Sequence, residues 1–387
     1  MTSTGLSAMS FYTPHRYVAL DRLAEHHSVD PEKFSKGIGQ EKIAMPGHDE
    51  DIVTMAAEAA KPIIDRYGFD GIDTILFATE TGIDQSKAAG IYLQRLLNMP
   101  ANIRNVELKQ ACYSATAALQ FACAYVARKP DRKVLVIASD VARYDRDSSG
   151  ESTQGAGAVA MLVTANPTLL EIGTATGLFS EDIMDFWRPN DRRTPLFDGK
   201  YSALRYLNAL VEAWRDYQAD GGEAYESFDR FCYHLPFSRM AEKAHQRLAK
   251  EAKSTPDMTL ALPGMVYNRQ IGNCYTASIY LAIISALETS DADLTGKRFG
   301  LFSYGSGATG EFFDAKVVEG YRDHLFAARH GDILKNRTAV SYDDYVALWD
   351  GKSGGADEVV EMPDEAAGRY RLASIDNQKR IYIDRDS

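Results

Sequence analysis

The segment ACYSATAAL at residues 111–119 recurs as NCYTASIYL at residues 273–281, in the other half of the chain. Each copy places a cysteine at the start of an apolar, alanine-rich run. Each is followed, about twenty residues later, by a basic-flanked apolar stretch, RKVLVIASD at 132–140 or KRFGLFSYG at 297–305. Two copies are too few for a solenoid, which needs at least three repeats to bury its faces. The repetition therefore predicts a duplicated α/β unit with one site built between its two halves.

Strand-like segments alternate with longer amphipathic segments on either side of these motifs, an order that predicts parallel or mixed sheets covered by helices. No Pro-, Gly- or Ser-rich linker interrupts the chain, so we expect one compact unit with a seam near 165–170. The first half would be residues 1–167 and the second residues 168–387, with a more polar, peripheral tail from about residue 331. The expected helices are 51–67, 85–98, 202–218, 238–253 and 276–289, and the expected strands are 73–79, 103–108 and 228–235.

Length and charge limit the possible functions. The 387 residues are 45% apolar, enough for a large core, and the formal charge is -11. We expect no nucleic-acid partner, because phosphate binding requires a basic face. No apolar run approaches the roughly 18 residues that span a bilayer, and no secretory signal is apparent. The cysteines lack regular spacing, so we expect reduced thiols in a cytoplasmic protein; they are Cys112, Cys123, Cys232 and Cys274.

Cys112 lies where an apolar strand region gives way to a helix. The free N–H groups and the dipole of a helix N-terminus favour a thiolate at such a position, which would make Cys112 nucleophilic. A small buried residue is the alternative interpretation, and it is the one that we adopt for Cys123 and Cys232. Cys274 has the same local setting as Cys112, so the pattern alone does not choose between them.

Two further side chains end apolar strands. Glu80 lies in LFATETGID, and His234 lies in CYHLPF just before Pro236. Ligands of open α/β sheets bind beyond the carboxyl ends of the strands. Glu80 is therefore a candidate general base with a raised pKa, and His234 a candidate for acid–base work or for holding a carbonyl oxygen. A capping glutamate and a hydrogen-bonded structural histidine are the alternatives.

Two glycine patterns, GAGAVA at 155–160 and GSGATG at 305–310, match the spacing of dinucleotide-binding loops. Strand-like rather than helical segments follow both, so we expect turns between strands and no Rossmann site. Backbone N–H groups near Gly305, Ser306 and Gly307 could point at a carbonyl oxygen as part of an oxyanion hole. The remaining histidines show no metal-ligand spacing, and no metal site is predicted.

Several motifs together resemble the hydroxymethylglutaryl-CoA synthase family, in its bacterial type. In chain order they are ATETGID, ELKQACYSATAALQ, GESTQGAGAVAML, DFWRP, CYHLPF, IGNCYTASIYL and LFSYGSGA. The similarity runs from about residue 5 to 350, and it assigns the nucleophile to Cys112 rather than Cys274. It implies the thiolase fold, in which two similar α/β halves form αβαβα layers, and a homodimer.

The resemblance also implies an acyltransferase of the mevalonate pathway, which condenses acetyl-CoA with acetoacetyl-CoA and uses no cofactor. Cys112 would carry the acetyl group, Glu80 would remove a proton from its methyl, and His234 would polarise the acceptor carbonyl. Asn273 would hold the acetoacetyl thioester carbonyl, and the backbone N–H groups of Cys112 and Ser306 would hold the acetyl oxygen. The residues implied at the acyl chain are Tyr144, Thr153, Ser202 and Ser306, with Lys243 at the CoA phosphates.

Three alternatives stay open. KQACYSATAALQ and EDIMDFWRP also resemble relatives that perform β-branching in polyketide biosynthesis with acetyl from an acyl carrier protein, although GIGQEKIAM at 37–45 fits the mevalonate enzyme better. A ketoacyl synthase of the Cys-His-Asn kind would use Cys112, His234 and Asn273 without Glu80. A non-catalytic homologue would bind CoA without forming an acetyl adduct.

Overall fold

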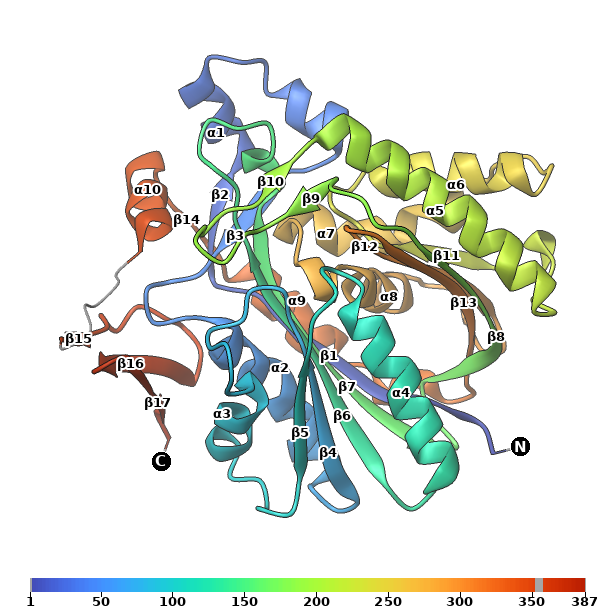
Figure 1. The fold of residues 1–387 in the computed structure, drawn as a ribbon, viewed down its shortest axis with the longest axis horizontal. Coiled ribbons are helices and arrows are strands. Elements are labelled where there is room, and N and C mark those ends of the chain that lie inside the picture. Colours follow the sequence, from blue (N-terminus) through green and yellow to red (C-terminus); the bar gives the residue numbers. More distant parts are fainter. Residues whose placement is uncertain (1, 352–357, 387) are drawn as a thin grey trace.

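The computed structural model describes residues 2–351 and 358–386. Its central feature is a twisted sheet of nine strands in the order β11-β12-β13-β8-β1-β7-β6-β4-β5 (Figure 1). The two halves of this sheet meet where β1 pairs with β8 over only two residue pairs. The strands are β1 (Thr4–Tyr12), β4 (Ile72–Ala78), β5 (Arg104–Leu108), β6 (Lys133–Ala142), β7 (Gly155–Ala165), β8 (Leu170–Ser180), β11 (Arg230–Tyr233), β12 (Arg298–Gly305) and β13 (Thr309–Val317).

The strand pairing is the same in the two halves. In the first, β1 pairs antiparallel with β7, β7 antiparallel with β6, and β6 parallel with β4. In the second, β8 pairs antiparallel with β13, β13 antiparallel with β12, and β12 parallel with β11. The helices that follow the two cysteine motifs, α4 (Ser114–Arg128) and α8 (Ser278–Glu288), occupy equivalent places. The structure thus confirms the duplicated α/β unit predicted from the repeat.

Helices cover the outer faces of both halves and fill the space between them (Figure 1). α2 (Ile52–Tyr67) and α3 (Ala89–Leu96) pack on the first half, whereas α5 (Gly199–Ala219) and α6 (Met240–Glu251) pack on the second. α4 and α8 lie between the halves in one shared core. The order of the layers is therefore α, β, α, β, α.

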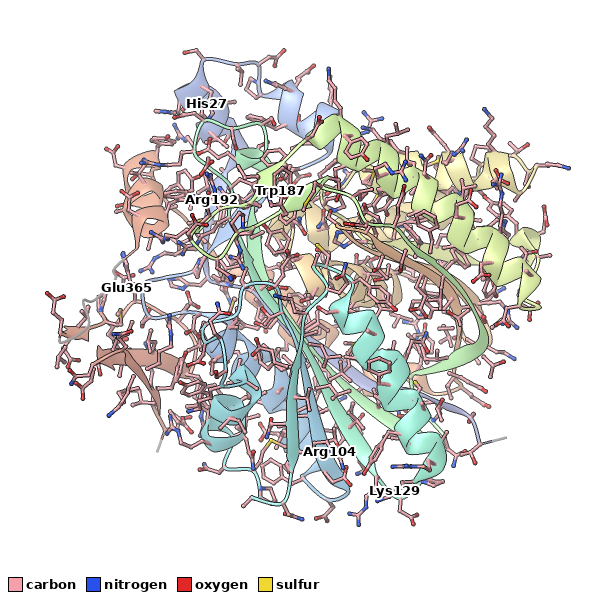
Figure 2. The ribbon with its side chains drawn as sticks, in the orientation of Figure 1. His27, Arg104, Lys129, Trp187, Arg192 and Glu365 are labelled. Carbon is pink, nitrogen blue, oxygen red and sulfur yellow. The ribbon has the colours of Figure 1, made fainter. Side chains whose placement is uncertain are left out.

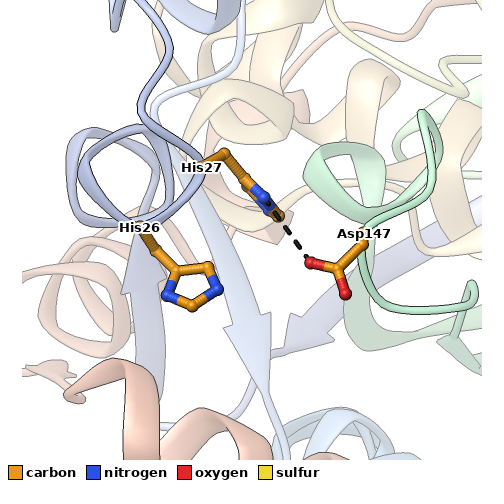
Figure 3. A group of neighbouring side chains, drawn as sticks. All are labelled: His26, His27 and Asp147. Atoms are coloured by element: carbon orange, nitrogen blue, oxygen red, sulfur yellow. Dashed lines mark ion pairs between the residues drawn. The ribbon is translucent and has the colours of Figure 1, made fainter.

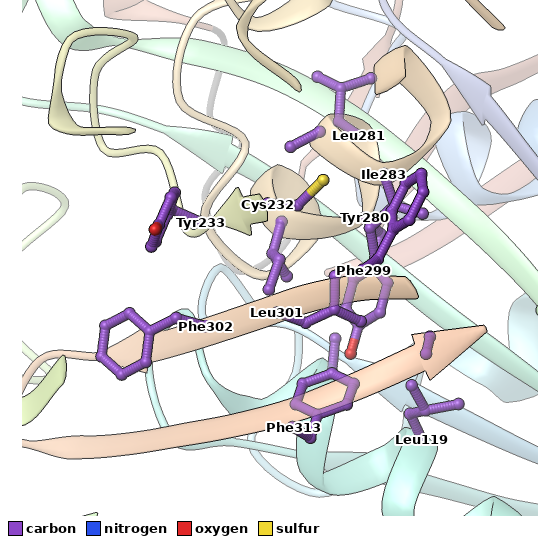
Figure 4. Packing of buried hydrophobic residues seen from close by; sticks show 14 of the residues in the cluster. Leu119, Cys232, Tyr233, Tyr280, Leu281, Ile283, Phe299, Leu301, Phe302 and Phe313 are labelled. Atoms are coloured by element: carbon purple, nitrogen blue, oxygen red, sulfur yellow. The ribbon is translucent and has the colours of Figure 1, made fainter. Parts of the chain in front are cut away.

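Alternation of side chains along β6 explains how one strand supports two layers. Val134 and Val136 face the central core with α4, whereas Leu135 and Ile137 face the core beneath α2. Successive side chains of a strand point to opposite faces, so a strand buried on both sides is apolar throughout. Figure 4 shows the same packing in the second half, where residues of β11, β12 and α8 interdigitate. Each large apolar side chain buried in this way contributes roughly 1.5–3 kcal/mol.

Smaller modules flank the main sheet. α1 and α10 pack with β2, β3 and β14 around a separate core, and β15, β16 and β17 form a sheet beside α2 and α3. The remaining elements are β2 (Arg16–Ala19), α1 (Leu20–His27), β3 (Lys42–Met45), β9 (Phe186–Trp187), β10 (Leu196–Phe197), α7 (Val266–Ile271), α9 (Ala327–Lys335), β14 (Thr338–Ala339), α10 (Tyr342–Asp350), β15 (Val359–Glu361), β16 (Tyr370–Asp376) and β17 (Lys379–Asp384).

Every helix and strand expected from the sequence is present, with bounds shifted by at most four residues. The largest shift is at α3, expected from residue 85 but beginning at Ala89. Asp84 Oδ1 accepts hydrogen bonds from the backbone N–H groups of Ser86 and Lys87, so the chain turns there before the helix begins. Both glycine patterns lead into strands, β7 and β13, as predicted. Among the described residues, no helix combines the length and apolarity that crossing a bilayer requires.

Candidate active site

The carboxyl ends of the parallel strands in both halves carry the predicted site residues. Glu80 follows β4, the loop with Cys112 follows β5, and Tyr144 follows β6, all three strands being parallel. His234 and Ser306 follow β11 and β12, which form the parallel pair of the second half. Ligand sites of α/β sheets lie at this end of the strands. The prediction that Glu80 and His234 lie at strand ends is confirmed.

Gly305 allows the two halves to approach each other at the site. A Cβ atom on Gly305 would lie 2.5 Å from the carbonyl oxygen of Gln110 and 2.7 Å from the backbone nitrogen of Tyr113. Gln110 also donates from Nε2 to the carbonyl oxygen of Ser306, at 3.4 Å. The end of β12 therefore lies directly against the loop that carries Cys112, which only glycine permits.

Cys112 and Glu80 are in direct contact. The Cys112 thiol donates to Glu80 Oε1 over 3.0 Å, and only 8% of Cys112 is exposed. The preceding Ala111 has φ +43°, in the left-handed region that an alanine rarely adopts, so the loop that presents the sulfur is strained. A nucleophile and a base within hydrogen-bond reach are the first requirement for covalent catalysis.

Burial dominates the electrostatics of this pair. It raises the pKa of Glu80 to about 8, with a further increase from the neighbouring Asp140 carboxylate. It also raises the pKa of the Cys112 thiol well above its usual range, and Glu80 raises it further. The raised pKa predicted for Glu80 is confirmed. The thiolate predicted at Cys112 from the helix dipole is wrong for the free protein, because burial and the adjacent carboxyl outweigh the N-terminus of α4.

Asp140 holds the Glu80 loop and ties it to the second half. Its Oδ1 accepts from the backbone N–H groups of Glu80 (2.9 Å) and Thr81 (3.0 Å) and from the hydroxyls of Thr79 and Thr81. Its Oδ2 accepts from the backbone N–H and the hydroxyl of Thr276, within the second cysteine motif. The sequence analysis missed Asp140, although it ends the apolar run RKVLVIASD just as Glu80 ends its own strand.

We expect Asp140→Asn to lower the free energy of unfolding by about 3 kcal/mol. The NH2 group of asparagine cannot accept a hydrogen bond, so the buried N–H and hydroxyl groups that now donate to one carboxylate oxygen would lose their acceptor. The urea midpoint measures this effect. Asp131→Asn, which changes an exposed carboxylate just before β6, should leave the midpoint unchanged. Equal midpoints for the two variants would show that the Asp140 contacts carry no such stability.

Tyrosines line the wall of the site next to Cys112. Tyr144 is 7% exposed, and its hydroxyl lies among those of Tyr275 and Thr153. Burial raises the pKa of Tyr144, and Cys112 raises it further. Cys112 and Tyr275 belong to one small apolar cluster that Phe186 covers. Tyr275 was not predicted, and its signal was its place in the second copy of the cysteine motif.

Among residues 2–351 and 358–386, the side-chain oxygen of Asn273 has hydrogen-bond donors, whereas no hydrogen bond is made by its amide nitrogen. Its Oδ1 accepts from the backbone N–H of Tyr275 and from the hydroxyl of Ser278, both at 2.9 Å, and its backbone N–H donates to the carbonyl oxygen of Thr153 at 3.2 Å. Because the side-chain oxygen is occupied, the NH2 group is the part of Asn273 that remains to donate to a ligand.

Asp185 organises the turn after β12. It is fully buried and accepts hydrogen bonds of 2.9 Å from the Ser202 hydroxyl, the Tyr304 hydroxyl and the backbone N–H of Gly307. Of the turn amides predicted for an oxyanion hole, Gly307 is therefore already engaged, which corrects that part of the prediction. Ser202 points at Asp185, a residue whose positioning role the sequence analysis missed within DFWRP.

His234 is buried and neutral. Only 3% of it is exposed, and burial lowers its pKa to about 3. Its Nδ1 has no hydrogen-bond partner among the described residues, whereas its carbonyl oxygen accepts from the Tyr206 hydroxyl. Among the described residues, no hydrogen bond joins His234 to Cys112 or Glu80. Tyr206 packs against Tyr304, which links His234 to the turn after β12.

Lys243 is the predicted residue that the structure leaves outside this group. It lies exposed on α6, with its ammonium 5.1 Å from the centre of the Phe237 ring. A groove of about 1210 Å³ reaches Glu80, Tyr275 and Ser306 from the surface. Trp187 and Arg192, labelled in Figure 2, belong to its wall.

Comparison with known proteins identifies the family. The family model described as hydroxymethylglutaryl-coenzyme A synthase N terminal matches residues 2–168, and the corresponding C-terminal model matches residues 258–380. The chain is 39% identical to hydroxymethylglutaryl-CoA synthase of Enterococcus faecalis, over 98% of this chain and 99% of that protein. It is 32% identical to the polyketide biosynthesis 3-hydroxy-3-methylglutaryl-ACP synthase PksG of Bacillus subtilis, over 91% and 89% of the two chains.

The solved structures agree with the sequence relatives. A crystal structure of an HMG-CoA synthase complexed with CoA has a TM-score of 0.94 and 36% identity to this chain, covering 99% of this chain and all of that one. The fold is therefore the thiolase fold, and the chain is a condensing acyltransferase. Within the class of condensing acyltransferases, the two family models and the relatives indicate one family. The chain belongs to the hydroxymethylglutaryl-CoA synthase family, as the sequence motifs predicted.

Proposed function

We propose that this chain condenses acetyl-CoA with acetoacetyl-CoA through an acetyl group carried on Cys112, giving hydroxymethylglutaryl-CoA and CoA. The observation that carries the proposal is the 3.0 Å contact between the Cys112 sulfur and Glu80 Oε1 at the carboxyl ends of the strands. The proposal is also supported by similarity over nearly the whole chain to a solved HMG-CoA synthase complexed with CoA.

The first step loads the thiol. Glu80 accepts the proton of the Cys112 thiol while the sulfur attacks the thioester carbonyl of acetyl-CoA. The tetrahedral adduct then collapses and expels the CoA thiolate, and Glu80 returns the proton to that thiolate. The backbone N–H groups of Cys112 and Ser306 hold the negative oxygen. One such donor is typically worth roughly 3–4 kcal/mol in catalysis.

The second step forms the carbon–carbon bond. Ionised Glu80 removes a proton from the acetyl methyl, and the resulting carbanion attacks the 3-carbonyl of acetoacetyl-CoA. His234 donates a hydrogen bond to that carbonyl oxygen, and the proton held by Glu80 returns to the new hydroxyl. A neutral imidazole suits this role because it donates without needing a charge in a buried site. Water then hydrolyses the thioester and restores the Cys112 thiol.

The neighbouring polar residues hold the substrates in this scheme. Asn273 donates from its free amide to the thioester carbonyl of acetoacetyl-CoA. Tyr144 and Thr153 contact the acyl chain, and Ser202 acts on the Ser306 turn through Asp185. Lys243, exposed on α6, contacts the CoA phosphates.

The acyl donor is tested by comparing turnover with acetyl-CoA and with an acetylated acyl carrier protein. We propose acetyl-CoA, because the identity to the Enterococcus faecalis enzyme, 39%, exceeds the 32% to the Bacillus subtilis ACP-type synthase. A kcat/KM at least about tenfold higher with acetyl-CoA, or 1.4 kcal/mol, supports the proposal. A preference for the carrier protein would move the chain to the β-branching class.

We further propose a homodimer formed across the edge strand β5. An unpaired edge invites pairing with another chain, and apolar side chains are exposed around it: Ile91 of α3 is 43% exposed, Val106 of β5 42%, and Phe121 of α4 60%. The groove that reaches Glu80 also borders Val106, so a second copy would enclose the site.

Val106→Arg tests this dimer. A charge on the edge strand should turn a dimer into a monomer in light scattering, whereas Leu178→Arg, at an even more exposed site on β8, should leave the dimer intact. A monomeric wild type, or a dimer that tolerates arginine at Val106, would contradict the interface.

We also propose that the chain is divided into two thiolase-like halves, residues 1–167 and 168–387. We propose in addition that the protein resides in the cytoplasm. The division falls between the end of β7 at Ala165 and the start of β8 at Leu170. The four cysteines are free and buried, which suits a reducing compartment.

A further inference from the structure

Three side chains from distant parts of the chain meet near the surface, away from the active site. His26 and His27 end α1, and Asp147 lies in the loop after β6 (Figure 3). One potential ligand atom of each lies within 4.8 Å of those of the other two. We propose that His26, His27 and Asp147 form a binding site for Zn²⁺. This inference is independent of the catalytic scheme.

The spacing of His27 and Asp147 fits two ligands of one metal better than a hydrogen-bonded pair. His27 Nδ1 and Asp147 Oδ1 are 3.6 Å apart, as the dashed line in Figure 3 marks. This distance is too long for a hydrogen bond. Two ligands with metal bonds of about 2.1 Å at a tetrahedral angle lie about 3.4 Å apart. The observed separation is therefore close to that of two ligands of one Zn²⁺ ion.

A buried carboxylate fixes the proton of His27. Glu151 is 1% exposed and its Oε2 lies 2.8 Å from His27 Nε2. A carboxylate only accepts, so Nε2 is the ring atom that donates to Glu151, and Nδ1 is the ring atom left on the side of Asp147 to bind a metal. Metal-binding histidines almost always show this arrangement, with a carboxylate or carbonyl behind the ring. Glu151 is itself held by the Tyr345 hydroxyl at 2.8 Å and by the backbone N–H of Asp147 at 3.0 Å.

His26 supplies the third ligand. Its ring stacks on Tyr342 of α10, with centres 3.5 Å apart and an angle of 13° between the planes, which limits the orientations that it can adopt. Both histidines lie in the last turn of α1, where the helix dipole favours a cation. Two imidazoles, one carboxylate and one water complete a tetrahedral set that suits Zn²⁺.

A metal here would tie α1 to the loop between β6 and β7. That loop carries Tyr144 and Thr153 at its two ends, and Gln154 at its exit bonds the Tyr345 hydroxyl that holds Glu151. The ion therefore acts as a clamp on a loop of the acyl site. Sequence analysis predicted no such site, because adjacent histidines lack metal-ligand spacing and Asp147 is distant in the chain.

The test uses the full chain without a histidine tag, freed of metal by chelation. Titration calorimetry with Zn²⁺ should show one site per chain, and Zn²⁺ should raise the thermal midpoint. Co²⁺ in its place should give the visible absorption of a tetrahedral ion without a near-ultraviolet thiolate band, which excludes the cysteines as ligands. The variants are His26→Phe, which keeps the stacking on Tyr342, and Asp147→Asn, which suits the left-handed backbone of that residue (φ +64°).

Both variants should bind Zn²⁺ at least about tenfold more weakly and lose the rise of the midpoint. Asp343→Asn, which removes an exposed carboxylate next to Tyr342, should bind as the wild type does. The proposal would be overturned if the wild type did not bind Zn²⁺, or if His26→Phe and Asp147→Asn bound Zn²⁺ with the affinity of the wild type. It would also be overturned if Asp343→Asn lost as much affinity as those two variants, or if Co²⁺ gave a thiolate band.

Discussion

Cys112→Ala should reduce condensation of acetyl-CoA with acetoacetyl-CoA by about 10⁵-fold or more, a loss comparable to that found when a covalent nucleophile is removed from other enzymes. The reason is that no other described thiol lies beside Glu80. The product-forming rate, followed by release of CoA, measures the effect.

Cys123→Ala is the matched control, because Cys123 is also buried, on α4, but packs in the hydrophobic core. This variant should keep activity within a few-fold of the wild type. If Cys112→Ala catalysed condensation at nearly the wild-type rate, the reaction would not pass through this sulfur.

Glu80→Gln should lower the condensation rate by about 10³–10⁴-fold, which is near the upper end of what a positioned general base contributes. Glutamine keeps the volume of the side chain but cannot take a proton from the acetyl methyl. Acetylation of Cys112 should become slower yet still reach completion, so that the acetyl-enzyme accumulates and is not discharged by acetoacetyl-CoA.

Glu107→Gln is the control for this variant, because Glu107 lines the same groove and its acceptor role toward the backbone N–H of Ala89 survives the change. Full activity of Glu80→Gln would favour a ketoacyl synthase of the Cys-His-Asn kind, which needs no carboxylate.

The pH dependence of condensation should show one ascending limb. Burial raises the pKa of Glu80 to about 8, so the carboxyl binds its proton below that pH, and the reactive ionised form increases as pH rises through 8. The value of kcat/KM for acetyl-CoA, which reports the ionisation of the free enzyme, should therefore rise about tenfold between pH 7 and 9 and then level off. Burial holds the pKa of His234 near 3, so this imidazole stays neutral and adds no limb between pH 5 and 9. A rate that is flat or falls from pH 7 to 9 would contradict this assignment.

The sequence predicted the architecture because the signals for it are local or repeated. Apolar periodicity located the elements, and the two cysteine motifs indicated the duplication that the strand pairing of β1, β7 and β6 against β8, β13 and β12 confirms. Glu80 and His234 could be found for the same reason, since each ends an apolar strand just before a loop.

The electrostatics of the site could not be predicted in this way. The helix dipole behind Cys112 is a local property, but the carboxyl that opposes it comes from Glu80, in the loop after β4. Likewise, Asp140 acts through Thr276, a contact between the two halves, and Asp185 acts through Gly307, a contact between distant segments of the second half. Such partners follow from tertiary structure rather than from spacing along the chain.

The account depends on an acetyl group that is carried by Cys112 and passed to acetoacetyl-CoA. Intact-mass and peptide mass spectrometry after mixing the wild-type protein with acetyl-CoA tests this most directly. We predict a mass increase of one acetyl group that maps to Cys112, is lost in Cys112→Ala, and disappears when acetoacetyl-CoA is added. An unmodified wild type, an acetyl group on another residue, or an adduct that acetoacetyl-CoA does not discharge would contradict it.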